Sequence, residues 1–227
     1  MMVGMGVLYM VRHGQARAQA YGAGAWAQAE GGLTDLGAEQ ARRAGSALAT
    51  RVGRIDRVVS GDLARQRETL ARIVAELPDA VEPSIDARWN EYDIESILGD
   101  RERTENATER GFQAQLDGAL SDWIARIAIG SETYEQYRQR ADAAFEELAR
   151  HAGSGQTVLA VSSAGTIAAI IARLWGIDDD RWLAIARTMI NTSVTKILIG
   201  SSGASVVSIN DHAHVDQADD RRLMTFR

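Results

Sequence analysis

Two short, continuous apolar runs constrain the fold of this chain more than any other feature of its sequence. Residues 7–11 read VLYMV and residues 157–161 read TVLAV. Runs without polar alternation are typical of strands buried on both faces of a parallel sheet. Helical patterns alternate with the strands, so we expect an α/β fold, a three-layer α/β/α sandwich with a mainly parallel central sheet.

The remaining elements follow from periodicity, caps and chain breakers. Helices are expected over residues 35–50, 62–77, 108–129, 133–152 and 167–174. Thr34 or Asp35 is the expected cap of the first of them, and Asp62 that of the second. Short strands are expected over 57–59, 193–199 and 204–209, with a mixed loop or short strand over 85–99. We interpret residues 1–227 as one domain with a helical excursion at about 99–152.

Composition excludes several classes of function. The 227 residues contain no cysteine, so neither disulfides nor a thiolate nucleophile is available. A net charge of −6 argues against a nucleic-acid partner, and no apolar run is long enough to cross a membrane. The first residues lack a basic region and a small-residue cleavage site, so we expect a cytoplasmic protein. The oligomeric state, a homodimer included, is left open.

Polar residues suited to phosphate chemistry follow the first apolar run. The tetrapeptide Arg12-His13-Gly14-Gln15 places a guanidinium, which binds phosphate as a fork, beside an imidazole that can form a covalent intermediate. Open α/β sheets hold their ligands at the carboxyl ends of strands. Three further segments carry residues of similar chemistry: 60–65 (SGDLAR), 89–91 (WNE) and 162–166 (SSAGT).

These segments resemble the landmarks of the histidine phosphatase superfamily, which includes cofactor-dependent phosphoglycerate mutases and many phosphatases. The resemblance covers nearly the whole chain. It also includes residues 33–41 (LTDLGAEQA) and the set Ser60, Leu63, Arg65 and Thr69. It implies a phosphoglycerate mutase-like fold and a phosphorylated small molecule as substrate.

The resemblance also assigns roles to individual residues. His13 would be the nucleophile that forms a phosphohistidine, and Glu91 the general acid that protonates the leaving oxygen. Arg12 and Arg65 would bind the phosphoryl oxygens, with Arg67 as a competing candidate for the second position. The implied reaction is hydrolysis of a phosphate monoester without metal or organic cofactor.

The fourth landmark departs from the family pattern, which usually reads Ser-His-Gly-Gly-Thr. Ser163 stands where the family has a second histidine. A serine hydroxyl can donate one hydrogen bond but carries no charge. We expect Ser163, Ala164 and Gln15 to contribute to phosphate binding, with backbone N–H groups at the helix start facing the anion. Loss of the histidine leaves an alternative open, a catalytically impaired protein that binds a phospholigand. A phosphoglycerate mutase is less favoured, because the segment after Glu91 differs from that of the mutases.

Two regions remain open to interpretation. His212 and His214, with Asp211 and Asp216, have the spacing of a metal site, but the resemblance favours a structural or pocket-rim role. A third interpretation is that one of these histidines partly replaces the missing one. Substrate specificity should lie in residues 16–32 and 95–135. The candidates there are Trp26, Trp123 and Tyr134 for an apolar wall and Arg101, Arg103 and Arg110 for further negative charge.

Overall fold

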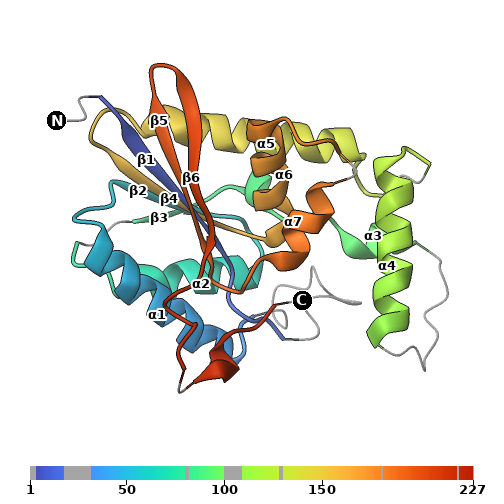
Figure 1. Ribbon diagram of the computed structural model, residues 1–227, viewed down its shortest axis with the longest axis horizontal. Helices are drawn as coiled ribbons and strands as arrows, with labels where there is room; N and C mark the ends of the chain where they lie inside the picture. The colour runs from blue at the N-terminus through green and yellow to red at the C-terminus, as the bar shows by residue number, and fades with distance from the viewer. Residues whose placement is uncertain are drawn as a thin grey trace.

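A six-stranded sheet with strand order β3-β2-β4-β1-β5-β6 forms the centre of the molecule (Figure 1). The computed structural model describes residues 4–17, 32–79, 82–99, 109–127, 130–179, 181–218 and 220–226. The strands are β1 (Gly6–Arg12), β2 (Arg57–Ser60), β3 (Pro83–Ile85), β4 (Thr157–Ser162), β5 (Val194–Gly200) and β6 (Gly203–Asp211). Pairings among β1 to β4 are parallel, and β5 and β6 add an antiparallel edge, which confirms the mainly parallel sheet.

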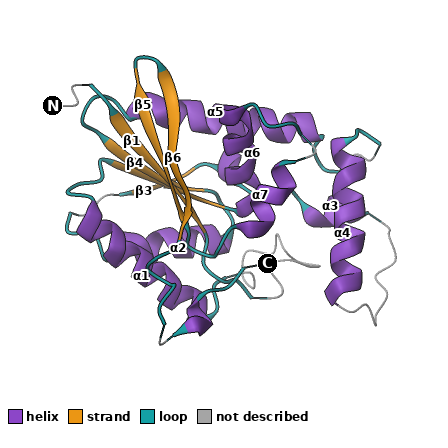
Figure 2. Cartoon of the chain, in the orientation of Figure 1, coloured by secondary structure: helices purple, strands orange, loops and turns teal. Residues whose placement is uncertain are grey.

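Helices cover both faces of this sheet, as expected for a three-layer sandwich (Figure 2). They are α1 (Asp35–Arg51), α2 (Ala64–Val74), α3 (Ile94–Leu98), α4 (Glu109–Ile124), α5 (Tyr134–His151), α6 (Ala164–Trp175) and α7 (Trp182–Thr188). Leu8 and Met10 of β1 pack in one buried cluster with residues of α5 and α6. Val11 of β1 packs with α1 and α2 in a cluster on the opposite face. The continuous apolar runs are thus explained by burial on both sides.

Local signals set most helix ends. Thr34 caps α1 by accepting a hydrogen bond from the Gly37 N–H, and Thr133 forms a capping box with Gln136 at the start of α5. The expectation for Asp62 is wrong: Leu63 is the N-cap of α2, and the Asp62 carboxylate pairs with Arg67 instead. Helix α7 was not expected from the sequence.

The order of the strands determines where polar side chains can gather. The strands β2, β4 and β1 are adjacent and parallel, so their carboxyl ends lie together at one end of the sheet. Helices α3, α4 and α7 lie together beyond this end, on the right in Figure 1. No helix among the described residues is long and apolar enough to cross a membrane.

Candidate active site

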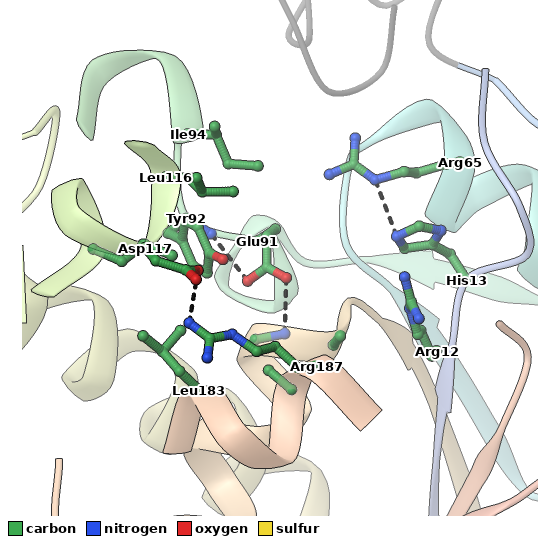
Figure 3. A pocket seen from close by; sticks show the side chains of 14 residues that line it. Arg12, His13, Arg65, Glu91, Tyr92, Ile94, Leu116, Asp117, Leu183 and Arg187 are labelled. Atoms are coloured by element: carbon green, nitrogen blue, oxygen red, sulfur yellow. Dashed lines mark hydrogen bonds and ion pairs between the residues drawn. The ribbon is translucent and has the colours of Figure 1, made fainter. Parts of the chain in front are cut away.

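A cavity opens where the strand ends meet helices α3, α4 and α7 (Figure 3). Five of the residues that the sequence predicted for the site line this cavity: Arg12, His13, Arg65, Glu91 and Ala164. The parallel pairing of Arg12 with Ser162 holds the end of β1 against β4, and the His13 N–H donates to the Ser162 carbonyl over 2.9 Å. The first and fourth landmarks are thereby joined by the sheet itself.

The His13 imidazole is held in one orientation by contacts at both ring nitrogens. Its Nδ1 lies 2.8 Å from the Gly14 carbonyl oxygen, which can only accept a hydrogen bond. The Nε2 lies 3.2 Å from Arg65 Nε, which can only donate one. The proton of a neutral imidazole therefore sits on Nδ1, and the Nε2 lone pair accepts from Arg65, a residue of the cavity lining.

The backbone around His13 is fixed as firmly as its ring. The Asn191 side chain donates to the His13 carbonyl over 3.0 Å, and the Gly14 N–H donates to the Thr69 hydroxyl over 3.0 Å. A Cβ atom at Gly14 would lie 2.5 Å from the Gly37 carbonyl oxygen, so the turn needs glycine. With only 2% of its surface exposed, His13 is a buried histidine on a rigid support.

Two guanidinium groups flank the imidazole. Arg12 and Arg65 are both buried, and an Nη1 of Arg12 donates to the carbonyl of Met189 just after α7. Figure 3 shows both arginine side chains beside His13 on one side of the cavity. Arg67, the competing candidate, instead forms a partly exposed ion pair with Asp62 at 3.1 Å. The structure therefore places Arg65, and not Arg67, beside His13.

The Glu91 carboxylate faces the histidine from the middle of the cavity (Figure 3). Its Oε1 accepts from the Tyr137 hydroxyl over 3.0 Å and its Oε2 from the Gly165 N–H over 2.8 Å. Burial raises the pKa of the Tyr137 hydroxyl well above its usual value, and the Glu91 charge raises it further, so this hydroxyl stays protonated as a donor. The approach to α6 requires glycine, since a Cβ at Gly165 would lie 2.5 Å from Oε1.

The start of α6 therefore meets a different anion from the one expected. The Gly165 N–H donates to the Glu91 carboxylate, so in this structure the N-terminal end of α6 holds this carboxylate in place. Ala164, the residue before it, lines the cavity.

Arg140, which sequence reasoning missed, holds the segment that carries Glu91. Its guanidinium donates to the backbone carbonyls of Arg88, Asn90 and Glu91 over 3.0, 2.7 and 3.3 Å. Glu132 accepts from the same guanidinium through both carboxylate oxygens, at 2.8 and 2.6 Å. This role of Arg140 is visible only in the folded structure, because nothing in the local sequence links residue 140 to residue 91.

Ser163 is buried next to Ala164 but is not itself among the residues that line the cavity, and its partner is Gln66. The Gln66 Nε2 donates to Ser163 Oγ over 2.9 Å and to the Trp89 carbonyl over 3.2 Å. Two acceptors at Nε2 fix the orientation of this amide, so Ser163 Oγ accepts and its own proton points elsewhere. Gln66 is fully buried, and its Oε1 has no hydrogen-bond partner among the described residues.

Gln15 lies apart from the cavity lining. Its Oε1 accepts from the Thr34 hydroxyl over 2.8 Å, and its N–H donates to Gln40 over 2.8 Å. These contacts tie the turn after β1 to α1. A direct contact between Gln15 and phosphate stays a prediction.

Of the individual residues that the sequence suggested for substrate specificity, the described ones do not form the cavity lining. Trp123 and Tyr134 are buried in a cluster behind the cavity and do not line it. Trp26, Arg101 and Arg103 lie outside the described residues, as does the side chain of Arg110. Leu116, Asp117 and Leu120 of α4 line the cavity and lie within the 95–135 region expected for specificity. The lining that sequence reasoning missed is Tyr92, just before α3, together with Ile94 of α3 and Leu183, Ala186 and Arg187 of α7.

The two C-terminal histidines do not reach the cavity. His214 Nε2 lies 3.0 Å from the Thr192 hydroxyl, and His212 Nδ1 contacts the Asn210 carbonyl. The Thr192 N–H in turn faces the His13 carbonyl at 3.4 Å, so His214 supports the turn at His13 through Thr192. Within the described part of the chain, no group of three or more histidine, aspartate or glutamate side chains could hold a metal ion.

The fold and the cavity define an α/β protein in which a buried histidine, two arginines and a carboxylate line one cavity. The chain belongs to the histidine phosphatase superfamily, branch 1, whose family model matches residues 8–212. It is an enzyme, a histidine-type phosphatase.

Several proteins that are similar to this chain are named as phosphatases. A glucosyl-3-phosphoglycerate phosphatase of Mycolicibacterium vanbaalenii is 32% identical over 218 residues, 92% of this chain and 86% of the relative. The solved mycobacterial glucosyl-3-phosphoglycerate phosphatase with inorganic phosphate is 25% identical, with a TM-score of 0.68, and the match covers 93% of this chain and all of that one (100%). The α-ribazole phosphatase of Shigella flexneri, at 24% identity, a TM-score of 0.67 and coverage of 91% and 97%, shares the fold.

Proposed function

We propose that this chain hydrolyses phosphate monoesters through a phosphohistidine formed on His13. The observation that carries the proposal is the orientation of His13, whose unprotonated Nε2 faces the cavity between Arg65 and Glu91. The buried guanidiniums of Arg12 and Arg65 would bind the non-bridging phosphoryl oxygens and offset the charge that develops in the transition state.

The first step breaks one bond and forms another at phosphorus. The Nε2 lone pair attacks the phosphorus atom, the P–O bond to the leaving group breaks, and Glu91 transfers its proton to the departing oxygen. Arg65 would exchange its contact with Nε2 for contacts with the phosphoryl oxygens. In the second step a water attacks phosphorus, Glu91 takes its proton, and the P–N bond breaks to release inorganic phosphate and neutral His13.

Ser163 would act in this scheme as a neutral hydrogen-bond donor at the place of the family's second histidine. Because Gln66 already donates to Ser163 Oγ, the hydroxyl proton is not used in that contact, and in this proposal it would be donated to a phosphoryl oxygen. Loss of one preorganised donor in a closed site costs about 10²- to 10³-fold in rate. We therefore expect a phosphatase that depends mainly on its two arginines.

The experiment is the trapping of a phosphoenzyme. Wild-type protein is mixed with an aryl phosphate, quenched in acid or in base, and its intact mass is measured, alongside release of the aryl alcohol. We expect a phosphoryl group that survives base but not acid, present in wild type and in His151→Gln, and absent in His13→Gln. His151 lies at the end of α5, outside the cavity lining, so its variant controls for the loss of a histidine. Phosphate binding without aryl alcohol release would instead support the phospholigand-binding alternative.

A further inference from the structure

The part of the cavity beyond Glu91 is where the alcohol part of a bound phosphate ester would lie. We propose that the preferred substrates are phosphate monoesters of apolar alcohols, with an alkyl or aryl body next to the ester oxygen. This inference rests on the proposed function, because His13 and Glu91 fix which end of the ester lies where.

The geometry gives the leaving group one direction. The phosphoryl group must contact His13 and Arg65 on one side of the cavity, and the ester oxygen must contact Glu91 in its middle. In Figure 3 the space beyond Glu91 is bounded by Ile94, Leu116 and Leu183, on the side opposite to His13. A leaving group therefore extends from Glu91 toward these side chains.

These side chains form a continuous apolar wall from three elements. Ile94 comes from α3, Leu116 and Leu120 from α4, and Leu183 and Ala186 from α7. Leu116, Leu120 and Leu183 are 5%, 2% and 8% exposed, so they are already desolvated before a ligand arrives. An alkyl or aryl group placed against them would lose contact with water and gain packing.

The polar groups of the wall are already engaged with each other. Among the described lining residues beyond Glu91, the one cationic side chain is Arg187, and it is paired with Asp117 at 2.6 Å. This pair joins α7 to α4 at the partly exposed rim. A hydroxylated or carboxylated leaving group placed against leucine and isoleucine would bury polar atoms that these side chains cannot pair, which is unfavourable.

The test compares two esters of primary alcohols that differ in polarity. We expect kcat/KM for n-hexyl phosphate to exceed that for glycerol 3-phosphate by at least about tenfold, since a hydrophobic pocket discriminates by about 10- to 200-fold per methylene. Equal values, or a preference for glycerol 3-phosphate, would overturn the inference.

A binding measurement separates this inference from the proposed function. Titration calorimetry with n-hexylphosphonate and 2,3-dihydroxypropylphosphonate, which cannot be hydrolysed at carbon, reports the wall without turnover. Tighter binding of the hexyl compound by about tenfold or more supports the wall even if no phosphoenzyme forms. Equal binding in a protein that does turn over aryl phosphate would reject the wall and leave the phosphatase mechanism standing.

Variants on one helix give a matched control. Leu116→Gln should reduce the hexyl-to-glycerol ratio about tenfold, whereas Ile124→Gln, on the same helix but outside this cavity's lining, should keep it. Leu183→Gln, on the short helix α7, repeats the test if the α4 variant does not fold. A ratio that changes equally in all three variants would show that the wall is not its source.

Discussion

Gly165 has no side chain, and this lets the start of α6 lie close to Glu91, the candidate acid. A methyl group there would lie 2.5 Å from Glu91 Oε1 and 2.6 Å from Cε1 of Tyr92. We expect Gly165→Ala to displace the Glu91 carboxylate and to lower kcat for an aryl phosphate about 10²-fold, the cost of a misplacement of roughly 1 Å. Steady-state kinetics with thermal unfolding measures the effect. Gly53→Ala is the control, since nothing lies within 4 Å of a Cβ at Gly53; a fully active Gly165→Ala would contradict the role given to Glu91.

Ser163 and Gln66 make a second prediction at the residue scale. Gln66 is fully buried with its amide nitrogen 2.9 Å from Ser163 Oγ, so an imidazole at position 163 would need the room that Gln66 occupies. We expect Ser163→His alone to lose about 1–3 kcal/mol of stability through overpacking and to gain no activity. The double variant Ser163→His with Gln66→Ala should recover that stability and exceed wild-type turnover of an aryl phosphate.

The four proteins of this double-mutant cycle are compared by denaturant unfolding and by kcat/KM. A non-additive stability of at least about 1 kcal/mol is the expected signature of the shared space. Additive effects, or a fully active and stable Ser163→His single variant, would show that Gln66 does not fill the place of the histidine.

The sequence could predict these residues only in part, for a physical reason. His13 could be predicted because it follows a recognisable strand, and Arg65 because its spacing from Ser60 and Leu63 favoured it over Arg67. Glu91 lies in an irregular segment and was predicted only through the family resemblance. The partner of Ser163 was not accessible, since Gln66 reaches it across 97 positions of the chain. The contact of His13 Nε2 with Arg65 is likewise tertiary, whereas the contact of Nδ1 is with the neighbouring Gly14 carbonyl.

At the scale of elements, the segment that carries Glu91 has no long regular structure of its own and depends on Arg140 of α5. We expect Arg140→Met to release three backbone carbonyls and leave Glu132 unpaired, and so to lower kcat by about 10- to 100-fold and the melting temperature by several degrees. Arg126→Met is the matched control. That arginine pairs with Glu135 at 3.4 Å on the exposed surface, where an ion pair contributes about 0–1 kcal/mol.

The contrast between the two arginine variants is what tests the idea. Similar losses in both would mean that Arg140 acts as a general stabilising charge. A loss of activity in Arg140→Met with unchanged affinity for inorganic phosphate is the result expected of a residue that positions the acid.

The elements themselves differ in how far local sequence determined them. Strands β1 and β4 are continuous apolar runs, and the caps Thr34 and Thr133 mark their helices, so these were predicted closely. The 3-residue strand β3 is exposed on the sheet edge, and α7 has only 7 residues, so neither left a periodic pattern. The apolar wall was out of reach because it unites residues of three elements only after folding.

At the scale of the whole molecule, the C-terminal segment closes the site from behind. Gln40 of α1 donates to the Leu223 carbonyl and to the Thr225 hydroxyl, both over 2.7 Å. The Asn191 N–H donates to the Thr225 carbonyl over 2.9 Å, and the Asn191 side chain holds the carbonyl of His13. The C-terminal end of the described chain is thereby tied to the turn at His13, so the geometry of that turn depends on residues far apart in the sequence.

The protonation of His214 makes the stability of this C-terminal region depend on pH. Burial lowers the pKa of His214 to about 4 from its ordinary value of 6.5, while the Asp211 charge opposes the shift and Arg51 and His212 add to it. Because the folded state binds this proton more weakly than the unfolded state, the neutral form stabilises the fold fully above pH 6.5. That stability is lost as pH falls toward 4, by up to about 3 kcal/mol. The pKa of Asp211 is lowered: burial alone would raise it, but hydrogen bonds from Ala213 and Arg51 outweigh that effect, so its own loss occurs at lower pH.

We therefore expect the free energy of unfolding of the wild type to fall between pH 6.5 and 4 with a slope that His214→Gln largely removes. Denaturant unfolding at half-unit pH intervals measures both proteins, and His151→Gln, which removes a histidine at the end of α5, is the control that should keep the wild-type slope. Aryl phosphate turnover at pH 7 should change little in His214→Gln if the amide maintains the contact with the Thr192 hydroxyl at 3.0 Å. An unchanged slope in His214→Gln would show that other groups carry the acid sensitivity, and that the turn behind His13 is not held by a neutral imidazole.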